Sequence, residues 1–166
     1  MASGERPFWR RIIAAQYKLY DRMRHRSAFE VAGQPATGRG FEEFRPFRQC
    51  LLITFKRSGD AVPAPVNFGL SEDGKLYVRT EADSAKVRRL RRAPEVRVCP
   101  CTFRGKPRGP VVEGRARVVP ESEHRAAYAT VASNWDLASR VFEGIVDRIG
   151  VPVTYVEITP APDSVG

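Results

Sequence analysis

The sequence predicts a mainly β protein, built as a small six-stranded antiparallel barrel with flanking helices and an N-terminal helical extension. Two observations carry this prediction. From residue 49 onward, short apolar runs alternate with turn residues at the spacing of an antiparallel barrel. A chain of 166 residues with 42% hydrophobic and 28% charged residues is also typical of one folded domain with a core, and not of a disordered chain.

The first residues have the pattern of a basic amphipathic helix, over 5–29. Aromatic and aliphatic side chains recur every three to four positions, and arginines fill most of the other positions. Such a helix packs on its own domain, on a partner subunit or on an anionic membrane surface, and these alternatives stay open. A stretch rich in Gly and Pro follows at 33–40. We therefore predict an extension over 1–45, a barrel domain over 46–160 and a tail over 161–166.

Three strands begin the barrel, at 49–56, 62–70 and 75–80, each separated from the next by turn residues. Pro63 and Pro65 fall within the second strand. Because proline cannot donate a hydrogen bond to a neighbouring strand, we expect an edge or a bulge there.

The rest of the chain alternates between helices and strands. A short helix is predicted over 83–93, since Pro94 ends it. After this helix we predict strands at 95–103 and 110–119, helices at 120–132 and 134–149, and a last strand at 151–159.

The formal net charge of +9 is unevenly distributed along the chain. Residues 1–48 contribute +5, residues 49–118 contribute +8, and residues 119–166 contribute −4. An anionic partner is therefore expected: a phosphorylated cofactor, a membrane surface or nucleic acid. Nucleic acid is the least favoured of these, because the strands show no face on which basic and aromatic residues alternate.

The sequence predicts neither a metal site nor a disulfide. Cys50, Cys99 and Cys101 lack a framework spacing, and only two histidines are present. The three cysteines are interpreted as buried, reduced thiols. With no apolar run long enough to span a bilayer and no signal-peptide pattern, we expect a cytoplasmic protein, with membrane contact through the N-terminal helix as an open alternative.

The most informative segment joins the third strand to the helix of 83–93. Thr80 and Ser84 offer hydroxyl groups, the helix start offers free backbone N–H groups, and Lys86 offers a positive charge. Together they have the chemistry of a phosphate-binding cradle. The alternative is an ordinary capped helix with a basic face toward solvent.

The motifs on either side of this cradle resemble a known family. They are a Pro-Val-x-Phe strand at 65–68, Asp-Gly-Lys-Leu-Tyr-Val at 73–78, Thr-x-x-x-Ser-x-Lys at 80–86 and Arg-Gly-x-Pro-Arg-Gly at 104–109. In this order and spacing the chain resembles the pyridoxamine-5′-phosphate-oxidase-like (PPOX class) split β-barrel flavin and deazaflavin proteins, and specifically their coenzyme F420-dependent oxidoreductases. The detailed resemblance covers about residues 46–119. It implies a six-stranded split barrel of the FMN-binding type.

The resemblance also implies a site. It implies a homodimer that holds two cofactors in grooves at the subunit interface, with the phosphate in the cradle described above and the tricyclic ring along the second strand. The cofactor-binding residues implied are Lys56, Arg57, Pro65, Val66, Asn67, Phe68, Thr80, Ser84 and Lys86. For Lys56 and Arg57 the alternative is a solvated turn, and for Phe68 it is a place in the core.

The activity implied is hydride transfer between coenzyme F420 and a small organic substrate that the sequence does not identify. No side chain is singled out as catalytic. FMN is the alternative cofactor, and a non-catalytic flavin- or deazaflavin-binding protein is the alternative function. F420 is favoured because its glutamyl tail needs positive charge at the groove mouth, which could come from Arg88, Arg89, Arg91, Arg92, Arg104, Lys106 and Arg108.

Overall fold

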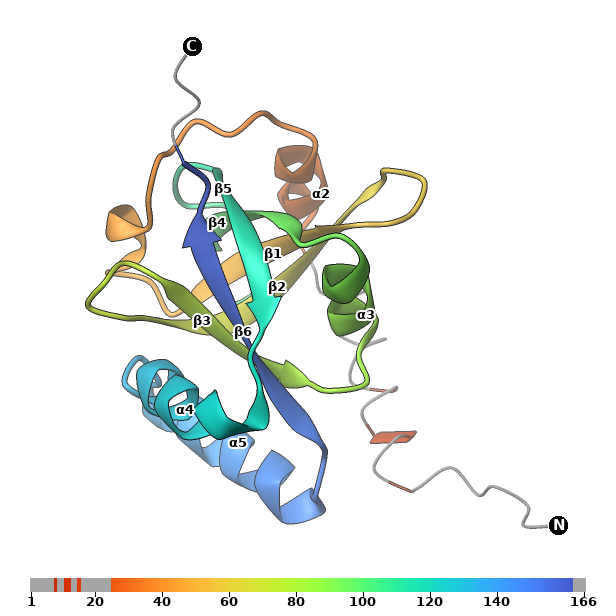
Figure 1. The fold of residues 1–166 in the computed structure, drawn as a ribbon, viewed down its shortest axis with the longest axis vertical. Coiled ribbons are helices and arrows are strands. Elements are labelled where there is room, and N and C mark those ends of the chain that lie inside the picture. The colour runs from red at the N-terminus through yellow and green to blue at the C-terminus, as the bar shows by residue number, and fades with distance from the viewer. Residues whose placement is uncertain (1–7, 9–10, 13–14, 16–24, 163–166) are drawn as a thin grey trace, which may run out of the picture.

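The computed structural model of the chain describes residues 8, 11, 12, 15 and 25–162. Six strands form a closed barrel in the order β1-β2-β3-β6-β5-β4 (Figure 1). All neighbouring strands are antiparallel. The predicted six-stranded antiparallel barrel with flanking helices is therefore confirmed.

The strands begin and end within two residues of the predicted positions. Their bounds are Gln49–Phe55 for β1, Ala61–Leu70 for β2, Leu76–Glu81 for β3, Glu95–Cys101 for β4, Val112–Val118 for β5 and Val153–Pro160 for β6.

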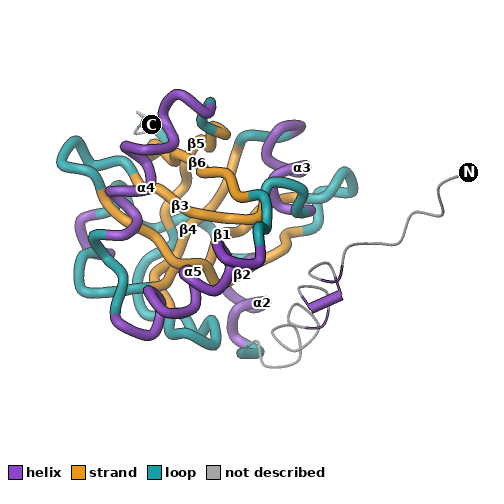
Figure 2. The backbone as a smooth tube through the Cα atoms, turned by 90° about the horizontal axis from the view of Figure 1, so that it is seen from below, coloured by secondary structure: helices purple, strands orange, loops and turns teal. Residues whose placement is uncertain are grey.

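Helices surround the barrel. They are α2 at Ser27–Ala32, α3 at Ala85–Arg92, α4 at His124–Ala132 and α5 at Leu137–Ile149, with short 3-10 turns at Glu42–Phe44 and Glu121–Glu123. Figure 1 shows α4 and α5 side by side below the barrel, and α3 on its flank. Figure 2, seen from below, shows the same grouping of helices around the strands.

Strand β2 explains why two prolines are tolerated in a closed barrel. Its residues 61–67 pair with β1, but only its last three residues, 68–70, pair with β3. Strand β3 continues to Glu81 alongside β6 instead. Pro63 and Pro65 therefore lie where β2 has a neighbour on one side only, which is the edge position that the sequence analysis expects.

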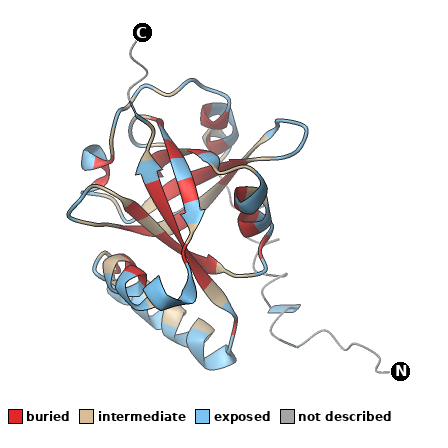
Figure 3. Ribbon diagram, viewed as in Figure 1, coloured by how far each residue is buried: buried red, intermediate tan, exposed pale blue. Residues whose placement is uncertain are grey.

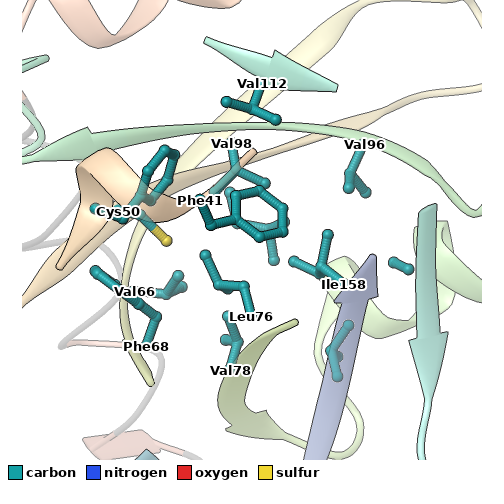
Figure 4. Packing of buried hydrophobic residues seen from close by; sticks show 14 of the residues in the cluster. Phe41, Cys50, Val66, Phe68, Leu76, Val78, Val96, Val98, Val112 and Ile158 are labelled. Carbon is teal, nitrogen blue, oxygen red and sulfur yellow. The ribbon is translucent and has the colours of Figure 1, made fainter. Parts of the chain in front are cut away.

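The main core fills the barrel, and Figure 4 shows side chains from several strands meeting there. Phe68, Leu76, Val98 and Ile158 are almost completely buried in it. Strand β1 is buried on both faces, because Leu52 belongs to this core while its neighbours belong to an outer cluster under α2. Burial on both sides accounts for the nearly continuous apolar sequence of β1.

Helix α2 belongs to that outer cluster. Its residues Ala28, Val31 and Ala32 are buried against Leu51 and Ile53 of β1. The predicted single helix over 5–29 differs from this arrangement, since position 25 is not helical and α2 begins at Ser27. The greater part of the predicted helix lies outside the described residues.

The predicted boundary between residues 45 and 46 stays a prediction, but residues before it contribute to the fold. Phe41 and Phe44 are 2% and 0% exposed and belong to the main core. The ring of Phe44 contacts that of Phe68 edge to face, with 6.0 Å between the centroids. The segment from α2 to Phe44 is thus packed on the barrel.

The three cysteines are free and buried, as predicted. Cys50 lies in the main core, whereas Cys99 and Cys101 share the outer cluster under α2. Burial raises the pKa of all three thiols. Thiols in this environment are poor nucleophiles, which agrees with a packing role.

A buried carboxylate joins β3, β5 and β6 on the outer surface of the barrel. Glu157 is 7% exposed and accepts hydrogen bonds from Tyr77 Oη at 2.7 Å and from Arg117 at 2.9 Å. Burial opposes ionisation of Glu157, but the bonds from Arg117 and Tyr77 outweigh burial, and the pKa of Glu157 is lowered. The ionised form is therefore favoured by folding.

We expect Glu157→Gln to reduce the free energy of unfolding by about 1–3 kcal/mol at pH 7, because it weakens these charge-assisted bonds. A lowered pKa in the folded state gives stability above the unfolded pKa that is lost as the pH falls. The difference between wild type and variant should therefore shrink below pH 4.5, the ordinary value for a glutamate. Urea unfolding of the wild type and the variant, at pH 7 and below pH 4.5, measures this effect. Glu95→Gln is the control, since its ion pair with Arg115 is exposed.

Candidate functional site

A cleft of about 430 Å³ opens where β2 and β3 separate. Its walls come from β2, from the end of β3, from α3 and from α5. The residues that line it are Gln49, Ala64, Pro65, Val66, Asn67, Arg79, Thr80, Glu81, Lys86, Phe103, Asp136, Ala138, Ser139, Phe142, Glu143, Val146, Val151 and Val153. The split in the barrel is therefore what makes the site.

The walls of the cleft that come from β3 and α3 carry two of the three residues of the predicted cradle. Thr80 and Lys86 both line the cleft, and both are buried, at 8% and 9% exposed. Lys86 thus does not lie on the solvent face of α3, which the alternative interpretation of a solvated basic face requires. The positive charge of Lys86 is therefore held at the cleft wall, where it can attract an anion that enters the cleft.

Ser84 has a different role in the described structure. It is the N-cap of α3, and its hydroxyl accepts a hydrogen bond from the backbone N–H of Val87 at 3.3 Å. Ser84 is not among the residues that line the cleft. Its cap fixes the start of the helix and, through it, the position of Lys86.

Another part of the cleft lining is mostly apolar. It includes Pro65 and Val66, together with Phe103 from the turn after β4 and Phe142 from α5. Asn67 also lines the cleft and accepts a hydrogen bond at 3.0 Å from the side-chain amide of Gln49. An apolar wall with one fixed amide is a suitable surface for a flat heteroaromatic ring.

Besides Ser84, three further predicted residues do not line the cleft. Phe68 is 1% exposed and packs in the barrel core, because alternate residues of β2 face opposite sides of the strand. Lys56 and Arg57 lie on the exposed turn between β1 and β2. The predicted residues that do line the cleft are Pro65, Val66, Asn67, Thr80 and Lys86.

The sequence analysis does not anticipate the most highly charged part of the cleft. Arg79 of β3 lines it with a side chain that is 3% exposed, and pairs with Glu143 and Asp147 of α5. The Arg79 guanidinium also lies over the ring of Trp135, 5.8 Å from the centroid. The signal in the sequence is an acidic pair four residues apart on an amphipathic helix, behind the capping residue Asp136.

Burial controls the ionisation of this charged cluster. It raises the pKa of Glu143, an effect that Arg79 only partly offsets. Burial also opposes the charged form of Arg79, but the carboxylates of Glu143 and Asp147 outweigh it, and the pKa of Arg79 is raised. Arg79 therefore stays a cation and needs a negative partner in the cleft.

Other classes of site are not found in the described parts of the chain. No group of three or more His, Cys, Asp or Glu side chains there could hold a metal ion. None of the described helices is long and apolar enough to cross a membrane.

Comparison with known proteins identifies the family to which this chain belongs. Residues 41–151, about two thirds of the chain, match the family described as pyridoxamine 5′-phosphate oxidase. The chain belongs to this family. The predicted PPOX-class resemblance is thereby confirmed, while its F420-dependent branch stays a prediction. A comparison of the sequence with curated proteins finds no match.

Solved structures of similar fold support the split barrel of the pyridoxamine 5′-phosphate oxidase family. The protein Atu2129 from Agrobacterium tumefaciens aligns with a TM-score of 0.56 and 17% identity over 78% of this chain and 58% of its own. The heme storage protein HutZ from Vibrio cholerae aligns with a TM-score of 0.53 and 16% identity over 74% of this chain and 88% of its own. An FAD-binding protein from Mesorhizobium loti aligns with a TM-score of 0.50 and 22% identity over 70% of this chain and 82% of its own. At such identities they show the fold alone.

Proposed function

We propose that the cleft binds a phosphorylated flavin or deazaflavin and that the protein is an oxidoreductase acting on a small organic molecule. The observation that carries the proposal is the presence of apolar lining residues and a buried lysine in one cleft. Membership of the pyridoxamine 5′-phosphate oxidase family supports a cofactor of the flavin type.

The residues present fit such a cofactor. Thr80 and Lys86 would hold its phosphate, and Pro65, Val66 and Asn67 would lie along its ring. A bound flavin or deazaflavin supplies the hydride chemistry, whereas the protein supplies binding, orientation and exclusion of water. A buried lysine and a hydroxyl are both donors, and each charge-assisted bond to a phosphate contributes about 1.5–3 kcal/mol.

We propose coenzyme F420 as the preferred cofactor and FMN as the alternative. The turn that carries Phe103 into the cleft also carries three exposed cations, Arg104, Lys106 and Arg108. They lie where an anionic glutamyl tail could leave the cleft. The arginines of α3 support this proposal less, since Arg89 bonds to Thr54 and Arg92 bonds to the carbonyl of Phe55.

Titration of the purified protein with F420, FMN and haem, followed by absorbance and fluorescence, tests the proposal. We expect F420 to bind more tightly than FMN, and removal of the glutamyl tail to abolish the difference. Equal affinity for both cofactors with no effect of the tail would refute the preference for F420. Haem is included because the fold is shared with a heme storage protein.

A non-catalytic flavin- or deazaflavin-binding protein would use the same cleft. Turnover separates the two functions: an enzyme oxidises or reduces a substrate in step with its cofactor, and a carrier only exchanges the cofactor. We also propose a cytoplasmic location, with contact between the N-terminal segment and a membrane surface as the alternative.

We further propose a homodimer with the cofactor at the subunit interface. Phe103 at the cleft is 54% exposed, and Phe29 of nearby α2 is 55% exposed. Large exposed aromatics beside an open cleft are typical of a surface that a second subunit covers.

Light scattering after gel filtration should give about twice the chain mass of 18.6 kDa. Phe103→Asp should shift the population toward the monomer, while Tyr128→Asp on α4 serves as an exposed aromatic control.

A further inference from the structure

Helix α5 forms one wall of the cleft but is weakly anchored. None of its 13 residues is buried, and Figure 3 shows it exposed or half-buried along its length. Leu137, Val141 and Ile145 on its outer side are 78%, 57% and 52% exposed. Since apolar burial is the main force that holds a surface helix to a core, α5 is held less firmly than its neighbour α4.

The strongest described attachment of α5 is electrostatic. Glu143 and Asp147, one turn apart on the helix, both contact the guanidinium of Arg79. The helix is delimited by the capping residue Asp136 and by Gly150, whose φ of 77° ends it in the left-handed region. A helix fixed mainly by one cation can move as a unit about its two ends.

Arg79 lines the cleft, as Thr80 and Lys86 do. Its Nε, and the indole Nε1 of Trp135 that stacks on it, are buried without a hydrogen-bond partner among the residues that the structure describes. The two carboxylates occupy the Nη1 and Nη2 groups of Arg79. Because a buried guanidinium cannot be left without an anion, an anion from the cleft that takes over these groups replaces the carboxylates, and Nε offers it a further donor. Release of α5 and binding of an anion at Arg79 are therefore coupled.

We infer that α5 is an autoinhibitory latch: its Glu143 and Asp147 occupy Arg79 as internal substitutes for an anion, and a phosphate entering the cleft competes with them and releases the helix. This inference rests on the proposed binding of a phosphorylated cofactor. The apparent affinity for that cofactor is then reduced by the fraction of molecules in which α5 is latched.

The double variant E143Q/D147N tests the latch, with FMN and riboflavin as probes, because riboflavin is the same ring without the phosphate. Neutralising both carboxylates should tighten FMN binding at least about fivefold by raising the fraction of open molecules. Riboflavin binding should not change. E95Q/E113Q is the control, since it removes the same charge from two exposed glutamates on β4 and β5.

Hydrogen exchange supplies a measurement that does not depend on affinity. The amides of α5 should exchange faster when FMN binds the wild-type protein, and equally fast in E143Q/D147N without ligand. If the double variant binds FMN more weakly than wild type, or if its α5 amides remain protected, the latch is refuted and the carboxylates only build the wall. If the wild type binds no FMN, F420 or haem, the proposed function fails, and the ligand-free exchange of the variant still decides the latch.

Discussion

Lys86→Met is expected to weaken FMN and F420 binding by about 10- to 100-fold, the equivalent of one lost charge-assisted contact to a phosphate. Lys86 follows Thr80 by six residues, and both residues are buried and line the cleft. Methionine keeps the length and the apolar stem of lysine, so the packing of α3 should persist. Fluorescence titration measures the affinity, and thermal unfolding verifies the fold.

Two comparisons sharpen the Lys86 experiment. Arg115→Met removes the same charge from an exposed ion pair on β5 and should leave affinity unchanged. Riboflavin, which has no phosphate, should bind the wild type and Lys86→Met alike. Unchanged FMN affinity in Lys86→Met would show that the phosphate is held elsewhere and would contradict the cradle.

The barrel could be predicted from the sequence because each of its strands carries local signals. Turn residues delimit the strands, and the two prolines of β2 mark a stretch that pairs on a single side. The helix starts are equally local, as the caps at Ser84 and Asp136 show. These signals act within a few residues, so their interpretation does not require knowledge of the fold.

The cleft could be predicted only in part, for the opposite reason. Thr80 and Lys86 are six residues apart and share one motif, which makes their meeting visible in the sequence. Arg79 and Glu143 are 64 residues apart and meet because α5 folds back under the barrel. A single sequence holds no signal for that contact beyond an acidic pair on an amphipathic helix.

The alternation of β2 explains the mixed outcome along its motif. The resemblance implies that four consecutive residues lie along the ring, but a strand presents alternate residues to opposite faces. Phe68 consequently packs in the core. Val66 lies at the boundary, 9% exposed, where it both lines the cleft and contacts the core.

Removal of the N-terminal residues should have the largest effect, and its size should depend on where the truncation ends. From the sequence alone, the break at 33–40 suggests that residues 1–40 are dispensable. The structure leads to a different expectation, because that deletion removes α2 from above Leu51 and Ile53 of β1. Three buried α2 side chains, those of Ala28, Val31 and Ala32, would be lost from that surface.

We therefore expect a protein lacking residues 1–40 to aggregate or to unfold at low denaturant, since exposed Leu51 and Ile53 would form an apolar patch. A protein lacking only residues 1–24 keeps α2 and should stay folded and bind its cofactor. Urea unfolding and cofactor titration of both truncations test this expectation. Cosedimentation with anionic liposomes then isolates the role of 1–24: binding by the full chain but not by its shorter truncation would assign that segment, with its many arginines, to a membrane surface. A stable, cofactor-binding 41–166 fragment would instead show that residues 1–40 are dispensable, as the break at 33–40 suggests.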